Sequence, residues 1–143
     1  MKSFGVEIPF VHHLGFTLQR MEGGESELHY EAQPEHLNSF AVTHGGASMT
    51  LLDVTMATAA RSETPDMGVV TMEMKTSVMQ PARGPLGAKG RLIHRTATMA
   101  FTEGTVYDAQ GKVCCHATGT FKYVRRLPVD GRNVNDLKVI STD

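Results

Sequence analysis

Residues Thr43–Arg61 read THGGASMTLLDVTMATAAR, and this stretch organises the rest of the chain. Between Gly46 and Ala60 its only ionisable side chain is Asp53, and its other residues are apolar, small or hydroxyl-bearing. A helix that is apolar on nearly every side is a buried helix. An ionised carboxylate in such a place is costly unless it is paired, hydrogen-bonded or open to a cleft. The stretch therefore predicts a buried helix whose single charge has a specific use.

The composition of the chain limits its partners. Its 143 residues suffice for one domain with a real core. The 14 basic and 15 acidic side chains nearly balance, so no excess charge favours nucleic acid or an anionic membrane. No apolar run approaches the roughly 20 residues that span a bilayer, and Glu7 and Pro9 stand where a signal peptide would be apolar. We therefore expect a cytoplasmic protein that binds neither nucleic acid nor membrane.

The cysteines and histidines show no pattern of a metal site. Cys114 and Cys115 are adjacent, and adjacent side chains of a strand point to opposite faces, which disfavours a disulfide between them. Both cysteines are better explained as small buried side chains. The spacing of the histidines matches no metal-binding motif. We therefore expect no metal.

Strand-like runs lie on both sides of the predicted helix. The run Glu25–Gln33 alternates apolar with polar residues, as a half-buried strand does. In the long run after the helix, Thr71 alternates onto the same face as Glu73 and Lys75. We expect six strands, at Gly15–Met21, Glu25–Gln33, Val69–Gln80, Leu86–His94, Thr98–Tyr107 and Val113–Val124. Strands joined by hairpins and curled around one apolar helix make an α+β fold.

The predicted sheet is largely antiparallel and has free edges, so we expect it to pair with a second copy of the chain. Residues 1–14 are expected to form an N-terminal segment lying on the fold. Residues 15–124 are expected to form the domain, and the polar residues 125–143 a C-terminal tail.

Three elements of the sequence carry a family resemblance. Asn38 is followed by His44-Gly45-Gly46, and Asp53 lies nine residues beyond His44. This spacing, at the head of an apolar helix, resembles the signature of hotdog-fold acyl-CoA thioesterases of the PaaI type, in the 4-hydroxybenzoyl-CoA thioesterase superfamily. The resemblance covers roughly residues 15–124 and departs at Ala41, where many members have glycine. It implies a hotdog fold, a thioester hydrolase and an acyl- or aryl-CoA substrate. No cofactor is implied, because CoA is part of the substrate.

Chemistry gives each of these residues a candidate role. Thioester hydrolysis needs a donor for the developing oxyanion and a group that activates water or attacks the carbonyl. A helix N-terminus offers free N–H groups and a positive dipole end, so Gly45 is the expected donor, with Gly46 beside it. Asn38 and His44 would orient the carbonyl or the departing sulfur. Asp53 would act as general base or as nucleophile, and the sequence does not choose between these two roles.

Distance along the helix bears on assembly. Nine helical residues place Asp53 roughly 13 Å along the axis from His44, whereas a catalytic contact spans about 3 Å. The resemblance implies that Asp53 works with the helix N-terminus of another subunit. We therefore expect a homodimer at minimum. A homotetramer built as a dimer of dimers is a further expectation, and the sequence does not show whether the dimers pair in this way. Thr71, where the resembling proteins often carry serine or threonine, would orient Asp53 or its water, or would simply face solvent.

Further residues are candidates for binding CoA, and two other functions remain open. Arg83, His94 and Arg95 carry the positive charge that phosphates attract, with Ala82 beside them, although basic residues near loop ends are commonly just solvated. A non-catalytic acyl-CoA-binding module would use the same fold. A hotdog hydratase or dehydratase would need a histidine and an acid in a different loop motif. The identity of the acyl group is not specified by the sequence.

Overall fold

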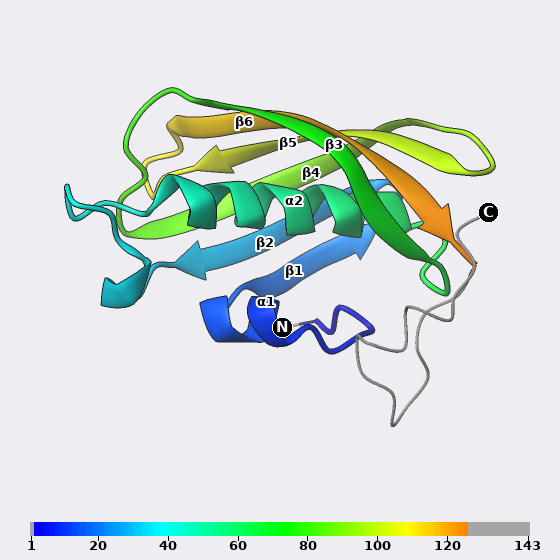
Figure 1. The fold of residues 1–143 in the computed structure, drawn as a ribbon, viewed down its shortest axis with the longest axis horizontal. Coiled ribbons are helices and arrows are strands. Elements are labelled where there is room, and N and C mark those ends of the chain that lie inside the picture. Colours follow the sequence, from blue (N-terminus) through cyan, green and yellow to red (C-terminus); the bar gives the residue numbers. More distant parts are fainter. Residues whose placement is uncertain (1, 126–143) are drawn as a thin grey trace.

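The computed structural model describes residues 2–125 (Figure 1). The elements in chain order are α1 (Pro9–Leu14), β1 (Thr17–Glu22), β2 (Glu25–Glu31), the 3₁₀ helix η1 (Pro34–His36), α2 (Gly45–Arg61), β3 (Gly68–Val78), β4 (Pro85–Arg95), β5 (Met99–Tyr107) and β6 (Val113–Val124). All six strands and the long helix lie where the sequence predicts them, whereas α1 and η1 were not predicted. The predicted tail lies outside the described residues except for Arg125.

The six strands form one antiparallel sheet in the order β1-β2-β4-β5-β6-β3. The sheet curves around α2, which lies against its concave face (Figure 1). Gly23 and Gly24 make the two-residue turn between β1 and β2, and both have positive φ angles, of 59° and 81°, as tight hairpin turns require. The predicted α+β arrangement of one helix wrapped by strands is confirmed.

Helix α2 approaches the sheet closely at one point. The Ser26 hydroxyl on β2 donates to the carbonyl oxygen of Thr55 over 2.6 Å. A Cβ atom on Gly90 of β4 would lie 2.6 Å from that same oxygen, so only glycine fits there. Leu51, Leu52 and Met56 of the helix are also fully buried. This packing explains why a helix so poor in polar residues is stable here.

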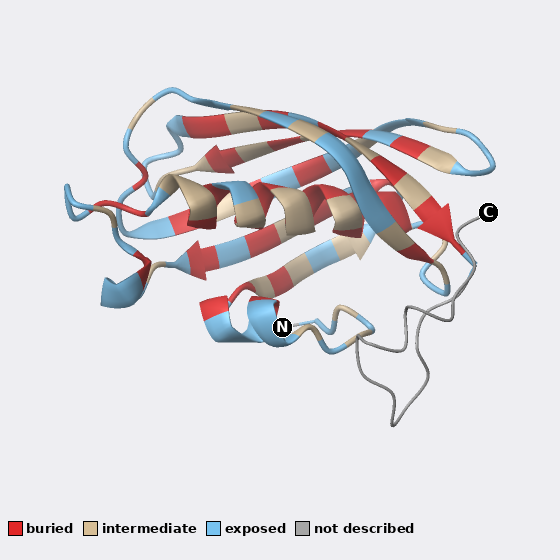
Figure 2. Cartoon of the chain, viewed as in Figure 1, coloured by how far each residue is buried: buried red, intermediate tan, exposed pale blue. Residues whose placement is uncertain are grey.

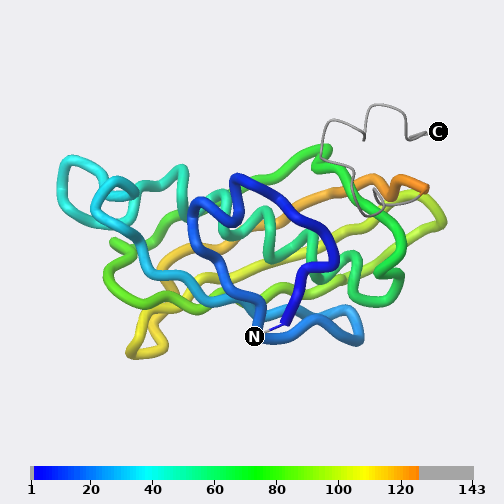
Figure 3. The backbone as a smooth tube through the Cα atoms, turned by 90° about the horizontal axis from the view of Figure 1, so that it is seen from below, coloured from blue at the N-terminus to red at the C-terminus, as the bar shows by residue number. Residues whose placement is uncertain are grey.

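Arg61 fixes the end of α2 to two other segments. Its buried guanidinium donates to the carbonyl oxygens of Met67, Phe4 and Pro65 over 2.9, 3.0 and 2.9 Å. Burial lowers the pKa of this side chain. These bonds join the N-terminal segment and the α2–β3 loop to the helix. In Figure 3 the N-terminal segment runs past the helix in the foreground.

Strand β3 contains a β-bulge that changes which side chains face the helix. Thr71 pairs with Phe121 of β6 and Glu73 pairs with Thr120, so Met72 is the extra residue. Opposed residues of antiparallel strands point to the same face, and Phe121 is fully buried. Thr71 therefore points toward the helix, whereas Met72 is 58% exposed. The simple alternation predicted for this strand, with Thr71 on the face of Glu73 and Lys75, is wrong because of the bulge.

The two edges of the sheet differ. At β1 the N-terminal segment covers part of the edge, where the Lys2 amide donates to the Leu18 carbonyl over 2.9 Å. Strand β3 pairs only with β6 within residues 2–125, so its other side is an open edge of 11 residues. Figure 2 shows this strand pale blue, and so exposed, over most of its length.

Two further expectations concern the described part of the chain. No helix in it is long and apolar enough to cross a bilayer. Cys114 and Cys115 are both buried and are not joined in a disulfide.

Candidate active site

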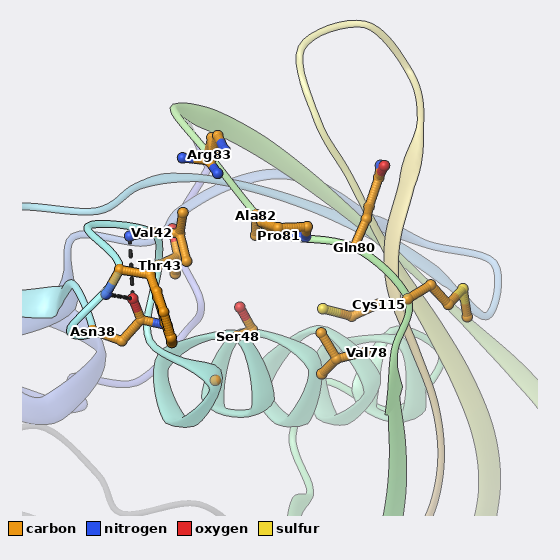
Figure 4. A pocket seen from close by; sticks show the side chains of 13 residues that line it. Asn38, Val42, Thr43, Ser48, Val78, Gln80, Pro81, Ala82, Arg83 and Cys115 are labelled. Carbon is orange, nitrogen blue, oxygen red and sulfur yellow. Dashed lines mark hydrogen bonds between the residues drawn. The ribbon is translucent and has the colours of Figure 1, made fainter.

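A cleft of about 480 Å³ opens beside the N-terminus of α2 (Figure 4). One wall is the loop before the helix, and the other is the connection from β3 to β4. A hydrogen bond of 3.0 Å from the Thr43 amide to the Ala82 carbonyl joins the two walls. The lining residues are Asn38, Phe40, Val42, Thr43, Gly45, Ser48, Val78, Met79, Gln80, Pro81, Ala82, Arg83 and Cys115.

The backbone amides of the first turn of α2 differ in their availability. The amides of Ala47 and Ser48 donate to the carbonyl of His44 over 2.9 and 3.1 Å, and the Gly46 amide donates to Nδ1 of His44 over 2.9 Å. The Gly45 amide has no partner among the residues that the structure describes. Gly45 also lines the cleft. Its N–H is thus the free donor of this turn, while the Gly46 amide is occupied as long as the bond to His44 holds.

His44 is the N-cap of α2, and this contact fixes its ring. Because Nδ1 accepts a hydrogen bond from the Gly46 amide, it carries a lone pair rather than a proton. The neutral ring then has its proton on Nε2. The side chain is exposed. His44 therefore has an N–H donor at Nε2, but neither it nor Gly46 is among the residues that line the cleft.

Asn38 holds the loop that leads to the helix. Its Oδ1 accepts from the amides of Phe40 and Val42 over 2.9 and 3.3 Å, the two bonds drawn in Figure 4. Between these residues Ala41 has a φ of +59°, which is uncommon outside glycine. The oxygen of Asn38 thus serves the loop. Its Nδ2 amide is the part of this side chain left to donate into the cleft.

Asp53 lies midway along α2 and faces β3. The Thr71 hydroxyl donates to its Oδ1 over 2.6 Å. Burial raises the pKa of the Asp53 carboxyl, and the hydrogen bond from Thr71 lowers it by a smaller amount. Asp53 is half-buried. The only carboxylate of the helix is thus reachable and hydrogen-bonded, as a catalytic base or nucleophile would be.

The carboxylate and the cleft are separate within one chain. Asp53 is not among the residues that line the cleft. Eight helical residues separate it from Gly45, which corresponds to about 12 Å along the axis. The described residues thus bring Asn38, His44 and Gly45 together at one end of α2, and Asp53 with Thr71 farther along.

The predicted CoA-binding residues also divide into two groups. Ala82 and the exposed Arg83 line the cleft. Arg95 instead lies 4.3 Å from the ring centre of Tyr123. His94 stacks on Phe101. Since the Tyr123 hydroxyl donates to the carbonyl of Ala60 near the end of α2, Arg95 lies far from Gly45 within the chain.

Sequence reasoning missed part of the cleft. Thr43, Ser48, Val78 and Cys115 line it, and none of them was predicted as a site residue. Thr43 and Ser48 lie in or next to the first turn of α2, so their closeness to Gly45 was a usable signal. Val78 and Cys115 are opposed in the β3–β6 register, and such pairing is not visible in one sequence.

The chain is similar to known proteins in sequence and in fold. The family model described as "Thioesterase superfamily" matches residues 40–115. The proofreading thioesterase EntH of Klebsiella pneumoniae is 29% identical over 111 residues, covering 76% of this chain and 81% of that protein. Among solved structures, the protein PA5202 of Pseudomonas aeruginosa has a TM-score of 0.79 at 26% identity, covering 83% of this chain and 96% of that one.

A third match concerns the fold alone. The E. coli PaaI protein from the phenylacetic acid degradation operon has a TM-score of 0.74 at 19% identity, and the match covers 83% of this chain and 84% of that one. The predicted hotdog fold is confirmed, and the predicted resemblance to thioesterases is confirmed by the family model.

Proposed function

The chain belongs to the thioesterase superfamily and is a thioester hydrolase, and from this premise we propose that it hydrolyses acyl-CoA thioesters to a carboxylic acid and free CoA. The observation that carries the proposal is the pair of half-sites on α2. One is the free Gly45 amide in a cleft, and the other is the Asp53 carboxylate held by Thr71. Hydrolysis needs both an oxyanion donor and an activating carboxylate.

The proposed reaction begins with the thioester carbonyl at the head of α2. Its oxygen accepts from the Gly45 N–H, aided by Nε2–H of His44 and Nδ2 of Asn38. With Asp53 as base, the carboxylate removes a proton as water adds to the carbonyl carbon. With Asp53 as nucleophile, its oxygen adds first and water then hydrolyses the resulting anhydride. In both routes the carbon–sulfur bond breaks, and the departing thiolate gains a proton.

A second copy of the chain completes the site in this proposal. The Asp53 of one protomer is too far from its own Gly45 to share a substrate. Strand β3 presents an open edge of 11 residues, and such an edge can pair with the same edge of another copy. On α2 beside this strand, Asp53 is bonded to Thr71 of β3 yet stays partly exposed, as do Val54 and Ala57, and Met49 is exposed. Pairing at β3 would bring this side of each helix toward the other protomer.

The cleft mouth suits the rest of CoA. Arg83 is exposed there, and its guanidinium would bind the phosphates. The proposed minimum assembly is a homodimer, with a homotetramer formed from two such dimers. The reaction as proposed uses no cofactor, because CoA arrives with the substrate.

A thiol-release assay tests the proposal. The wild-type protein is given a panel of aliphatic and aromatic acyl-CoAs, with Asp53→Asn as the matched inactive variant. We expect CoA release from at least one substrate, and a loss of about a hundredfold or more in Asp53→Asn. Release from none of the panel would refute the acyl-CoA assignment. Equal rates for the variant would refute the role of Asp53.

A complementation assay tests the shared site. Asp53→Ala and Asn38→Ala protomers are each expected to be nearly inactive. In a mixed dimer, one site combines an intact Asn38 with an intact Asp53, and in the other site both residues are replaced. One of the two sites in each mixed dimer should therefore be active. Mass spectrometry of the intact assembly checks that mixed dimers have formed. Stable mixed dimers without recovered activity would count against the shared site.

A further inference from the structure

Phe40 is the most exposed large apolar residue in the part of the chain that the structure describes. It is 81% exposed and lies on the loop that leads into α2. A phenylalanine ring in water loses the free energy that burial would give it. This residue also lines the cleft that contains the free Gly45 amide. An apolar ring that is open to solvent and lines a cleft is available to a ligand that enters there.

The loop fixes the main chain at Phe40 through its own hydrogen bonds. The Asn38 amide donates to the Val42 carbonyl over 2.8 Å, and the Ala41 amide donates to the Asn38 carbonyl over 3.0 Å. The Phe40 amide donates to Oδ1 of Asn38 over 2.9 Å. Since the ring is largely exposed, it adds little to the stability of this loop. Folding of the loop therefore does not explain why the ring is held at the cleft.

The opposite wall of the cleft also carries exposed apolar side chains. Val78 and Met79 line the cleft and are 60% and 57% exposed. In Figure 4 Asn38, at the base of the Phe40 loop, and Val78 lie on opposite sides of Ser48. Single exposed apolar residues are normal at a protein surface, whereas an apolar patch within a concave site is typical of a ligand-binding groove.

The charge of the cleft indicates which part of a substrate each region suits. Arg83 is the only charged residue among the described residues that line the cleft. In an acyl-CoA the nucleotide carries the phosphates, the pantetheine arm is interrupted by amide groups, and a saturated acyl chain is wholly apolar. The Arg83 guanidinium therefore suits the nucleotide. The exposed apolar walls suit the acyl chain, because contact with it removes apolar surface from water on both sides.

We propose that Phe40 is a specificity-determining residue that covers the acyl chain of the bound substrate, so that the enzyme prefers long apolar acyl chains to short ones. In the proposed function, on which this inference rests, the thioester carbonyl binds at the Gly45 amide, and the acyl chain thus begins inside the cleft. Carbons farther along the chain lie between the Phe40 ring on one wall and Met79 on the other. Each added methylene then buries more apolar surface.

A series of saturated acyl-CoAs tests this proposal. We measure kcat/KM for butanoyl-, hexanoyl- and octanoyl-CoA with the wild type, Phe40→Ala and Phe40→Leu. Full burial of a methylene corresponds to about fourfold in kcat/KM, so about twofold is expected in a cleft that covers the chain only in part. The wild type should then favour octanoyl over butanoyl by about sixteenfold. Phe40→Ala should reduce this preference to about fourfold or less, with Phe40→Leu between the two.

Phe10→Ala is the matched control, because Phe10 is 58% exposed on α1 and does not line the cleft. This variant should keep the wild-type dependence on chain length. Both alanine variants should melt near the wild-type temperature, since each ring is largely exposed in the folded protein. The kcat/KM for butanoyl-CoA should change little in Phe40→Ala. Analytical ultracentrifugation should show the same assembly for the wild type and Phe40→Ala.

The outcomes separate this inference from the proposed function. The same chain-length preference in Phe40→Ala as in the wild type would overturn the role of Phe40 and leave the acyl-CoA assignment standing. A preference lost together with dissociation of the assembly would also overturn it, because the ring would then contact a second copy of the chain. A wild type that hydrolyses butanoyl- and octanoyl-CoA equally well would do the same. Release of CoA from no acyl-CoA at all would refute both proposals.

Discussion

Thr71 on β3 donates its hydroxyl hydrogen to Oδ1 of Asp53 on α2 over 2.6 Å, which links the edge strand to the single carboxylate of the helix. The bond exists because the bulge at Met72 turns Thr71 toward α2. Burial raises the pKa of Asp53, and Thr71 partly opposes that rise. The hydroxyl therefore helps to keep the carboxylate ionised as well as to fix its orientation.

Replacing Thr71 with valine should move the acid side of the pH–rate profile. In the proposed reaction Asp53 acts in its ionised form, so kcat/KM should fall as the pH drops through the pKa of Asp53. Without the hydrogen bond this pKa rises further, and the acid limb shifts to higher pH. We also expect kcat/KM near neutral pH to fall about tenfold. Thr71→Ser keeps the hydroxyl and should resemble the wild type. Coincident acid limbs for valine and wild type would contradict this account.

The same carboxylate should cost the protein stability. The pKa of Asp53 is raised in the folded state. The free energy of unfolding of the wild type is therefore higher at low pH, where Asp53 is protonated, and it falls as the pH rises through that raised pKa. Asp53→Asn should therefore be more stable than the wild type at pH 7. The difference should shrink as the pH is lowered toward the usual range of an aspartate, near 4.

Urea unfolding of both proteins at several pH values and one protein concentration measures this effect. Asp53→Asn should at the same time lose activity, as active-site residues that destabilise the fold commonly do. A variant that is less stable than the wild type at pH 7 would show that the carboxylate is better solvated or paired than its surroundings indicate.

The side chain of Asn38 has an oxygen that holds the loop and an Nδ2 donor that the proposed reaction uses, and two substitutions separate their contributions. Asn38→Asp keeps an oxygen for the amides of Phe40 and Val42 but removes the Nδ2 donor. Asn38→Ala removes both. We expect the alanine variant to lose about 1–2 kcal/mol of stability and the aspartate variant to stay near the wild type.

Both Asn38 variants should lose catalytic rate, by about a hundredfold for the loss of one donor to the oxyanion. Thermal unfolding and kcat are measured on the same preparations. Full wild-type kcat in Asn38→Asp would show that Asn38 acts only by holding the loop, and that Nδ2 does not contact the substrate.

The sequence alone predicted the strands and the long helix, but not the side-chain contacts between them. Apolar periodicity and turn residues located six strands and α2 because both signals are local. The orientation of Thr71 depends on a bulge at Met72, which follows from pairing with β6 rather than from the strand itself. His44 was predicted as a site residue from its spacing to Asp53. The hydrogen bond that its side chain accepts from the Gly46 amide depends on the side-chain rotamer, which the sequence does not show. The cleft wall at Val78 and Cys115 is likewise a product of strand register.

Ala41 stands where many members of the resembling family have glycine, and its backbone conformation predicts an effect on stability that can be measured. This residue has a φ of +59°, a left-handed conformation that costs an L-residue with a side chain roughly 1 kcal/mol or more. Glycine adopts it without that strain, although it loses more entropy on folding. We expect Ala41→Gly to stabilise the protein by about 0.5–1 kcal/mol, or a few degrees in melting temperature.

Ala109 is the matched control for this last substitution. It is also an exposed alanine in a turn, but it is not among the residues with positive φ. Ala109→Gly gains no relief of strain and adds freedom to the unfolded chain, so it should leave the melting temperature unchanged or lower it slightly. If Ala41→Gly lowered the melting temperature as Ala109→Gly does, the loop between Asn38 and Val42 would not store the strain that its backbone indicates, and its shape would be set by the Asn38 bonds alone.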